Sequence, residues 1–205
     1  MINVYLTKSN SLAGKSTSDL DGLSDFGQAE LDRLRSIASD TRRSESASAL
    51  EALRKLLLIC GHTPHCIART DNGKPYFEGE FSLPFSISHS GGICAAAIGS
   101  LDDGDIGIDL EILRPVRDAQ GIAKRFFDKN ELEAFYKSEQ TDFDFLKLWT
   151  QKEARAKTSG IGLFERAQAD DTPLFLHTQT VFVDECEAVL SVCSKKQVDG
   201  IIIHK

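Results

Sequence analysis

The stretch FSISHSGGICAAAIGSLDDGDIGIDLEI, residues 85–112, decides the fold that the sequence predicts. Two apolar runs, FSIS (85–88) and ICAAAIG (93–99), are expected to form strands, and they are joined by the small-residue turn HSGG. LDDGD (101–105) is a second turn signal, after which IGIDLEI (106–112) alternates like a further strand. The stretch therefore predicts three strands, with a boundary between two parts of the chain near LDDGD.

The N-terminal side is predicted to contain a strand, two helices and a hairpin. Leu50, Leu53 and Leu57 recur at helical spacing and mark the stronger of the two helices. Its approach, TRRSES, is cationic and rich in hydroxyl groups, and DNGKP is a strong turn signal. The expected elements are a strand over 1–6, a polar loop over 7–25, helices over 28–37 and 46–60, a strand over 65–70 and the turn at 71–75.

The C-terminal side repeats this order of elements. Helices are expected over about 118–127, 130–138 and 143–158, the last of which ends at Ser159 and Gly160. From Leu174 onward, LFLHTQTVFV, EAVLSVC and GIIIH have the pattern of strands separated by polar turns. The sequence thus predicts an α+β fold of two similar lobes, residues 1–102 and residues 103–205.

The charge and composition exclude several classes of protein. The chain has 205 residues and a formal net charge of −7, with 41% hydrophobic and 27% charged residues. An acidic balance argues against a general nucleic-acid binder, and we find neither a signal peptide nor an apolar stretch of membrane-spanning length. Five cysteines without a CxxC pair are typical of reduced, buried thiols. We expect a cytoplasmic protein with no nucleic-acid or membrane partner.

The segment CGHTPHC (60–66) contains four side chains able to bind metals, Cys60, His62, His65 and Cys66. Their crowding does not match common zinc sites, in which a dozen or more residues separate two ligand pairs. Gly61 also has the pattern of a helix stop after an apolar helical run. We therefore interpret the segment as a structural turn.

The strand IGIDLE places two carboxylates on one face, because Asp109 and Glu111 are two residues apart. Two aligned oxygen donors suit Mg²⁺, which commonly takes one or two carboxylates and completes its coordination with water and substrate phosphates. Acidic residues at this spacing also occur on solvated strand faces. The pair taken alone leaves both interpretations open.

Three further signals point to phosphate chemistry. Glu153 and Lys157 are four residues apart on one helical face, where they form either a surface ion pair or a carboxylate beside a phosphate-binding ammonium. His89 lies in the turn SISHSGG, whose glycines permit close approach of a ligand, although such a histidine can also be merely exposed. Lys74, in GKP, belongs either to a solvated hairpin or to an anion site. Together these signals suggest phosphate groups, a hard cation and a proton acceptor.

The order and spacing of these motifs resemble the 4′-phosphopantetheinyl transferases of the larger, monomeric class, the type that activates surfactin synthetase. The matching segments are GKPYF, FSISHSGG, IGIDLE, RFF and LWTQKEARAKTSGIGL, which span about residues 73–163. The resemblance implies two similar α+β halves, a pseudo-dimer, with coenzyme A bound in the cleft between them. It also implies Mg²⁺-dependent transfer of phosphopantetheine from coenzyme A to a serine of an apo acyl or peptidyl carrier protein.

The resemblance carries roles to particular positions. It implies Asp109, Glu111 and Glu153 as magnesium ligands, with Glu153 also the general base. It implies that Lys157 contacts the pyrophosphate and that Ser88 and His89 touch the phosphates of coenzyme A. It also implies that Lys74 and Pro75 lie at the nucleotide end. His89 and Lys157 are then expected to stabilise the charge that develops on the departing phosphate.

The part of the site that binds the 3′-phosphate has no motif here. Basic residues near the N-terminus have this role in the family, and Arg42 and Arg43 are candidates because they precede a predicted helix, whose N-terminus attracts anions. Solvated loop charges are the alternative for both, and Arg35 and Ser48 are further candidates. RFF (125–127) and the helix after it are expected to contact the carrier protein.

Two other functions remain open. One is a non-catalytic protein that binds coenzyme A or a carrier protein with the same fold, and the other is a Mg²⁺-dependent phosphohydrolase that directs the acidic cluster at water. Fatty-acid, polyketide and nonribosomal-peptide synthesis are the alternatives for the pathway of the carrier. We expect a monomer, because two lobes in one chain would complete the site.

Overall fold

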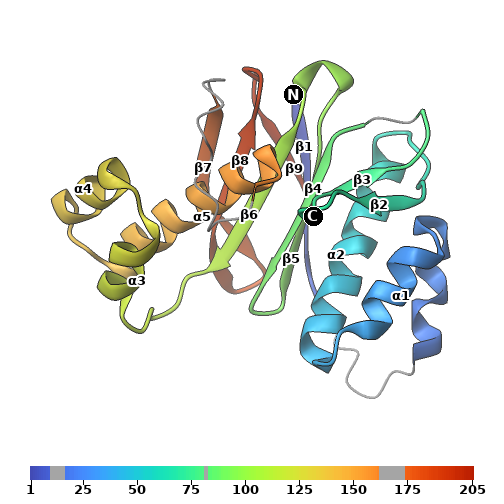
Figure 1. Cartoon of the computed structure of the whole chain (residues 1–205), viewed down its shortest axis with the longest axis horizontal. Helices are drawn as coiled ribbons and strands as arrows, with labels where there is room; N and C mark the ends of the chain where they lie inside the picture. The colour runs from blue at the N-terminus through green and yellow to red at the C-terminus, as the bar shows by residue number, and fades with distance from the viewer. Residues whose placement is uncertain (10–16, 81–82, 162–173) are drawn as a thin grey trace.

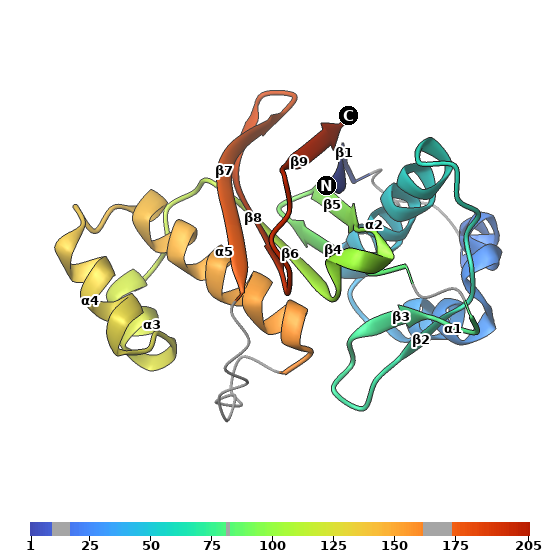
Figure 2. The same ribbon diagram turned by 90° about the horizontal axis from the view of Figure 1, so that it is seen from above.

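The structure is a computed structural model, and it describes residues 1–9, 17–80, 83–161 and 174–205. It has a mixed α+β architecture, in which helices flank a central group of strands (Figures 1 and 2). The elements are β1 (Ile2–Lys8), η1 (Thr17–Phe26), α1 (Gln28–Ser36), α2 (Asp40–Ile59), β2 (Ile67–Arg69), β3 (Pro75–Phe77), β4 (Phe85–Ser90), β5 (Ile93–Ile98), η2 (Leu101–Asp103), β6 (Ile106–Ile112), α3 (Ala119–Phe126), α4 (Lys129–Lys137), α5 (Asp142–Ser159), β7 (Phe175–Val183), β8 (Cys186–Ser194) and β9 (Ile201–His204).

The described strands form two main sheets and one short hairpin. The first sheet has the order β4-β5-β1-β9, the second has the order β6-β8-β7, and β2 pairs with β3. All these pairings are antiparallel except β1 with β9, which run parallel, with Ile2 opposite Ile201. The last strand of the chain therefore lies in the same sheet as the first. The boundary predicted between residues 102 and 103 stays a prediction.

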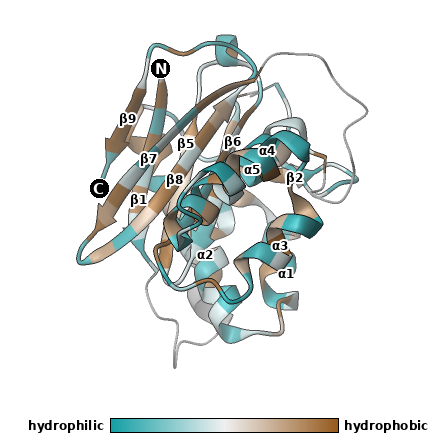
Figure 3. Ribbon diagram, turned by 90° about the vertical axis from the view of Figure 1, so that its left-hand side faces the viewer, coloured by the Kyte–Doolittle hydropathy of each residue, from teal (hydrophilic) through white to brown (hydrophobic). Residues whose placement is uncertain are grey.

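Apolar residues pack on both faces of the first sheet. Ile2, Val4 and Leu6 of β1 join a core shared with β6, β7 and β8. Ala96 and Ile98 of β5 join a second core, which α1 and α2 cover. A strand buried on both faces has a continuous apolar run instead of an alternating pattern, which explains ICAAAI. Figure 3 shows these brown strands beside helices that carry much teal on their outer surfaces.

Serine side chains join the two sheets where β4 runs beside β6. Ser86 Oγ accepts a hydrogen bond from Ile108 N at 3.1 Å, and Ser88 Oγ accepts one from Leu110 N at 3.3 Å. Ser90 Oγ continues the series by donating to Glu111 at 2.5 Å. The alternation in SISHS thus places three hydroxyls against β6, because every second side chain of a strand points to the same side. This junction brings Ser88 and His89 next to the IGIDLE strand.

Gly107 allows α5 to lie directly on β6. A Cβ at this position would lie 2.1 Å from Ala154 O and 2.6 Å from Thr158 N, so no larger residue fits without movement of the main chain. Thr158 Oγ1 closes the contact by donating to Ala154 O and to Cys193 O of β8. The close packing fixes the distance between α5 and β6, the strand that carries Asp109.

Most predicted elements are confirmed within a few residues, but two local predictions were wrong. Helix α2 begins at Asp40 instead of residue 46, because Ser39 accepts a hydrogen bond from Arg42 N and caps the helix there. Arg42 and Arg43 therefore lie in its first turn and do not precede it. His89 lies within β4 and not in the turn, since β4 extends to Ser90.

The loop predicted over 7–25 is also corrected in part. Thr7 and Lys8 continue β1, and η1 is a 3₁₀-helix, while residues 10–16 lie outside the described residues. The helix stop predicted in CGHTPHC is confirmed, because Cys60 caps α2 and Gly61 has φ 78°. Gly160, with φ 71°, ends α5 as predicted.

Candidate functional site

A buried cluster of hydrogen bonds forms where β4, β6 and α5 meet. Asp109 Oδ1 accepts from Ser88 Oγ at 2.9 Å and from Lys157 Nζ at 2.7 Å. Lys157 also donates to Ser88 Oγ at 3.1 Å. Asp109 is only 5% exposed, so its charge depends on these contacts and on whatever else approaches it. Three of the residues chosen from the sequence thus meet at one point.

The second oxygen of this carboxylate lacks a partner. Asp109 Oδ2 is the one buried side-chain nitrogen or oxygen among the described residues that has no hydrogen-bond partner. A buried carboxylate oxygen normally has one, because an unpaired polar atom away from water is costly. Asp109 and Glu111 line the same cavity, so this oxygen is available for a further contact there.

The pKa values of the other two carboxylates, Glu153 and Glu111, are raised. Burial first, and then the charges of Asp109 and Glu111, raise the pKa of Glu153 to about 7 against the opposing effect of Lys157. The pKa of Glu111 is also raised, by burial first, and its hydrogen bond from Ser90 opposes that rise. Arg114 lies 3.7 Å from Glu111. Burial is the main cause of both shifts, and the neighbouring carboxylates add to it.

The donor set fits a small hard cation, although not as a three-carboxylate cage. The part of the chain that the structure describes contains no group of three or more His, Cys, Asp or Glu side chains arranged to hold a metal ion. Mg²⁺ commonly takes only one or two protein carboxylates and leaves its other positions to water and substrate oxygens. Asp109 and Glu111 meet that requirement. The role of Glu153 as a third ligand stays a prediction.

His89 is held by a residue that the sequence analysis did not single out. Glu45, on α2, lies 3.2 Å from His89 Nδ1 and accepts a hydrogen bond from Gly92 N at 2.9 Å. Ser46 Oγ lies 3.4 Å from the other ring nitrogen. Burial lowers the pKa of His89 below its ordinary value, Glu45 opposes this shift, and Lys157 adds to it. The lowered pKa favours the neutral imidazole, and the contacts with Glu45 and Ser46 fix the orientation of the ring.

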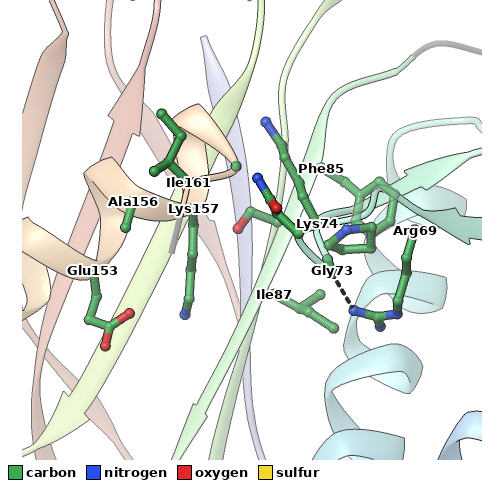
Figure 4. Close-up of a pocket in the computed structure, with 13 residues that line it drawn as sticks. Arg69, Gly73, Lys74, Phe85, Ile87, Glu153, Ala156, Lys157 and Ile161 are labelled. Carbon is green, nitrogen blue, oxygen red and sulfur yellow. Dashed lines mark hydrogen bonds between the residues drawn. The ribbon is translucent and has the colours of Figure 1, made fainter. Parts of the chain in front are cut away.

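Two cavities run along this junction. One, of about 330 Å³, is lined by Ser88, His89, the carboxylates and Lys157. The other, of about 380 Å³, extends to the β2–β3 hairpin and the end of α5. Figure 4 shows Lys74 and Gly73 on one side of this second cavity and Glu153, Ala156 and Lys157 on the other. Glu153 and Lys157 line both cavities, so the two form one elongated site.

Lys74 and Pro75 lie at the hairpin end of this site, as the GKP motif predicts. Lys74 Nζ donates to Thr158 O at 2.6 Å and lies 2.9 Å from Asp105. The side chain thus spans from the hairpin to the end of α5. Gly160 lies close under it, since a Cβ there would be 3.1 Å from Lys74 Cδ.

Arg42 and Arg43 are not among the residues that line these two cavities. Arg43 donates to Ile37 O at 2.8 Å and forms an ion pair with Asp40 in the same helix turn. Their role at the 3′-phosphate stays a prediction without support from the cavity linings. Ser88, His89, Lys157, Lys74 and Pro75, by contrast, line one cavity or both.

Two other arginines line the site, and sequence reasoning missed both. Arg69 borders both cavities, and Arg33 borders the one that contains the carboxylates. Both contact Glu30 of α1, whose side chain is 2% exposed. The available signal was weak: Arg33 is three residues after Glu30, and Arg69 lies just before the DNGKP turn. Nothing in the sequence says that these segments meet.

This buried carboxylate predicts an acid-sensitive contribution to stability. Burial would raise the pKa of Glu30, but hydrogen bonds and charges from Arg69 and Arg33 hold it below its ordinary value of 4.5. The folded state therefore prefers the ionised form. Glu30 contributes stability above pH 4.5, and this contribution disappears as the pH falls through its lowered folded pKa. Chemical denaturation from pH 6 to pH 3 should show a steeper loss of unfolding free energy in wild type than in Glu30→Gln; equal slopes would contradict the assignment.

Comparisons with known proteins agree with the motifs. Residues 105–198 match the sequence model of the 4′-phosphopantetheinyl transferase superfamily. The 4′-phosphopantetheinyl transferase ffp of Bacillus subtilis is 43% identical over 94 residues, which are 44% of this chain and 39% of that protein. The 4′-phosphopantetheinyl transferase HetI of Nostoc is 34% identical over 137 residues, 58% of this chain and 57% of its own length.

The matches cover only part of the relatives. The 4′-phosphopantetheinyl transferase AcpT of Escherichia coli is 29% identical over 130 residues, 60% of this chain and 63% of that protein. The chain therefore spans less than two thirds of the length of these curated relatives. The matched region contains Asp109, Glu111, Glu153 and Lys157, the core of the site described above. The resemblance predicted from the motifs is thus confirmed, and residues 105–198 carry the sequence pattern of the 4′-phosphopantetheinyl transferase superfamily.

Proposed function

We propose that this protein transfers 4′-phosphopantetheine from coenzyme A to a serine hydroxyl of an apo acyl or peptidyl carrier protein. The observation that carries the proposal is the cavity where β4, β6 and α5 meet, which Asp109, Glu111 and Glu153 line together with Lys157 and His89. Acidic and cationic groups in one site suit a polyanionic substrate whose pyrophosphate reacts. In the reaction the serine oxygen bonds to the β-phosphorus, the pyrophosphate P–O bond breaks, and adenosine 3′,5′-bisphosphate leaves.

The proposed architecture is a pseudo-dimer of two lobes, residues 1–102 and 103–205, with coenzyme A between them. In its support, the cavities take residues from both stretches of the chain, among them Lys74 and His89 from the first and Asp109 and Lys157 from the second. Strand β9 crosses back to pair with β1 and would tie the lobes together. One chain would then supply a complete site, as a monomer requires.

Asp109 and Glu111 are the residues that would hold Mg²⁺, and Glu153 is proposed as a further ligand. The ion, when bound, supplies positive charge that neutralises and orients the pyrophosphate. The unpartnered Oδ2 of Asp109 and the raised pKa of Glu111 support this assignment. Ser88 and Ser90 would fix the two carboxylates, since each donates a hydrogen bond to one of them.

The remaining chemistry belongs to the side chains of this chain. Glu153 is proposed to accept the serine proton directly or through water, because it lines the site and its pKa of about 7 lets it take up a proton near neutral pH. Lys157 would place its ammonium against the negative charge that develops on the leaving phosphate. His89, whose Nδ1 lies against Glu45, would donate from Nε2 to the same phosphates in its protonated form, which the anionic phosphates would favour.

The carrier protein is proposed to dock on RFF (125–127), at the end of α3, and on the helix that follows. Arg125 lies in the last turn of α3 beside Lys124, while Phe126 packs edge-on against Trp149 of α5. The contact couples this surface to the helix that carries Glu153.

Throughout the residues that the structure describes, no helix is long and apolar enough to cross a membrane.

The direct test is mass spectrometry of a carrier protein. Incubation with coenzyme A, Mg²⁺ and an apo carrier should add the mass of one phosphopantetheinyl group to the carrier and release adenosine 3′,5′-bisphosphate. A carrier whose acceptor serine is replaced by alanine is the control. Absence of the adduct on fatty-acid, polyketide and nonribosomal-peptide carriers alike would reject the transferase. Coenzyme A binding without transfer would instead favour the binding protein, and hydrolysis without a carrier would favour the phosphohydrolase.

A further inference from the structure

One buried carboxylate organises two arginines at the edge of the candidate site. Glu30 Oε1 accepts hydrogen bonds from Arg33 Nε and from Arg69 Nη2, both at 2.9 Å. Glu30 Oε2 accepts one from Arg69 Nε at 3.2 Å. The contact between Arg69 and Glu30 is thus bidentate, which fixes the plane of the guanidinium as well as its position. Glu30 belongs to α1 and Arg69 to β2, so the contact also joins two elements.

The contact extends to the turn that carries Lys74. Arg69 Nη1 donates to Gly73 O at 2.9 Å, a bond visible in Figure 4. The guanidinium is therefore held at three points, by both oxygens of Glu30 and by the main chain of the hairpin. Lys74, the next residue, reaches from there to the end of α5. A shift of Glu30 would move Arg69 and this turn together.

Both guanidiniums keep donors for a ligand. Arg69 uses one N–H on each of its three nitrogens in these bonds, and each terminal nitrogen carries a second. Arg33 approaches Glu30 through Nε and Nη2, which leaves the N–H groups of Nη1. The two side chains are 32% and 28% exposed, and both line the cavity that contains Lys157. Two fixed guanidiniums beside a cavity suit a phosphate group.

Stability alone does not explain this arrangement. A buried ion pair is often replaceable by apolar residues without loss of stability, because desolvation offsets much of the attraction. Glu30 also removes one positive charge from the pair of arginines, which weakens their general attraction for anions. What the carboxylate supplies is orientation, since it holds two long side chains that would otherwise sample many rotamers.

We propose that Glu30 is a positioning residue that preorganises Arg33, Arg69 and the Gly73–Lys74 turn to bind the 3′-phosphate of coenzyme A. This inference rests on the proposed function. The pyrophosphate is assigned to the end of the site that contains Asp109, Glu111 and Lys157. The 3′-phosphate is the other phosphate group of the molecule, and the arginines line the same cavity while the side-chain bonds described above go to Glu30 and Gly73. Charge-assisted bonds from two guanidiniums fit such a phosphate monoester.

The direction in which Glu30→Gln changes the affinity for coenzyme A distinguishes positioning from simple electrostatics. Glu30→Gln removes a negative charge near the bound phosphate, so an electrostatic effect alone would tighten binding. Loss of positioning would weaken it, because the amide cannot accept from both guanidiniums as strongly as the carboxylate does. A purely structural role would lower thermal stability without distinguishing between ligands.

The experiment compares coenzyme A with 3′-dephospho-coenzyme A by calorimetry on the full-length chain. We expect Glu30→Gln to weaken coenzyme A binding by about tenfold, the equivalent of one charge-assisted hydrogen bond. Binding of the dephospho form should change by less than about twofold. Steady-state rates should show a raised KM for coenzyme A with little change in kcat. The matched control is Asp32→Asn, the same chemical change at an exposed position of α1.

Arg69→Lys provides a second test that keeps the charge. An ammonium cannot bond both oxygens of Glu30 and Gly73 O in one plane, so the same selective loss is expected. Equal losses for both ligands, unchanged affinities, or tighter coenzyme A binding by Glu30→Gln would each overturn the positioning role. Wild type that binds neither ligand would overturn the proposed function itself. Wild type that binds both ligands equally would show that the 3′-phosphate is not recognised and would reject only the inference about Glu30.

Discussion

Glu153→Gln is expected to reduce phosphopantetheine transfer by about 10²–10⁴-fold while coenzyme A binding changes little. The amide has nearly the shape of the carboxylate but cannot accept a proton from the carrier serine. The half-buried side chain lies between Asp109, Glu111 and Lys157, where burial and two like charges raise its pKa to about 7. The measurement is the rate of carrier modification under saturating substrates, alongside calorimetric affinity for coenzyme A.

The matched control for this variant is Glu185→Gln. Glu185 is an exposed residue of the turn between β7 and β8 and lines neither cavity. The same change there should leave transfer at the wild-type rate. If Glu153→Gln also turned over at the wild-type rate, the assignment of Glu153 as the general base would have to be abandoned. A joint loss of binding and turnover would assign it to ligand binding instead.

Gly107→Ala is expected to destabilise the protein and reduce transfer together. The new methyl group would lie 2.1 Å from Ala154 O and 2.6 Å from Thr158 N, and neither main-chain atom can move unless α5 moves. Overpacking of this kind typically costs about 1–3 kcal/mol and sometimes more. For a chain of this length, each kcal/mol lowers Tm by roughly 2–4 °C.

The expected loss of activity has a geometric origin. Glu153 and Lys157 project from the part of α5 that lies on Gly107, so a lifted helix would separate Lys157 from Asp109. Transfer should therefore remain reduced at temperatures where the variant is fully folded by circular dichroism. Gly22→Ala is the control, because a Cβ there meets no atom within 4 Å. A Gly107→Ala variant with wild-type Tm would show that α5 adapts without cost.

The order of elements was predictable from local pattern, and most boundaries agree closely. IGIDLEI forms β6 over the predicted residues because its alternation suits a strand whose inward side chains are buried. The start of α2 was not predictable from the leucine pattern, since Leu50, Leu53 and Leu57 report only the buried part of the helix. Its first turns are polar and exposed, and the cap at Ser39 sets where they begin.

Only those parts of the candidate site that belong to a single strand or helix were predictable from the sequence. Asp109 with Glu111, and Glu153 with Lys157, each share a face because of strand and helix periodicity. Arg33, Arg69 and Glu45 were missed because each acquires its role from a contact with a distant segment. Glu30 and Arg69 are 39 residues apart, and no periodicity links them.

The sequence by itself determined the α+β class, the two carboxylates on one strand and the resemblance to a transferase superfamily, because each depends on short-range spacing or on motifs read in order. The tertiary structure decided which charges share a cavity. Packing of β4 against β6 through Ser86 and Ser88, and of α5 on Gly107, brings together side chains from three elements. Electrostatic coupling depends on distance in space and on burial, and neither quantity is written in the spacing of residues along the chain.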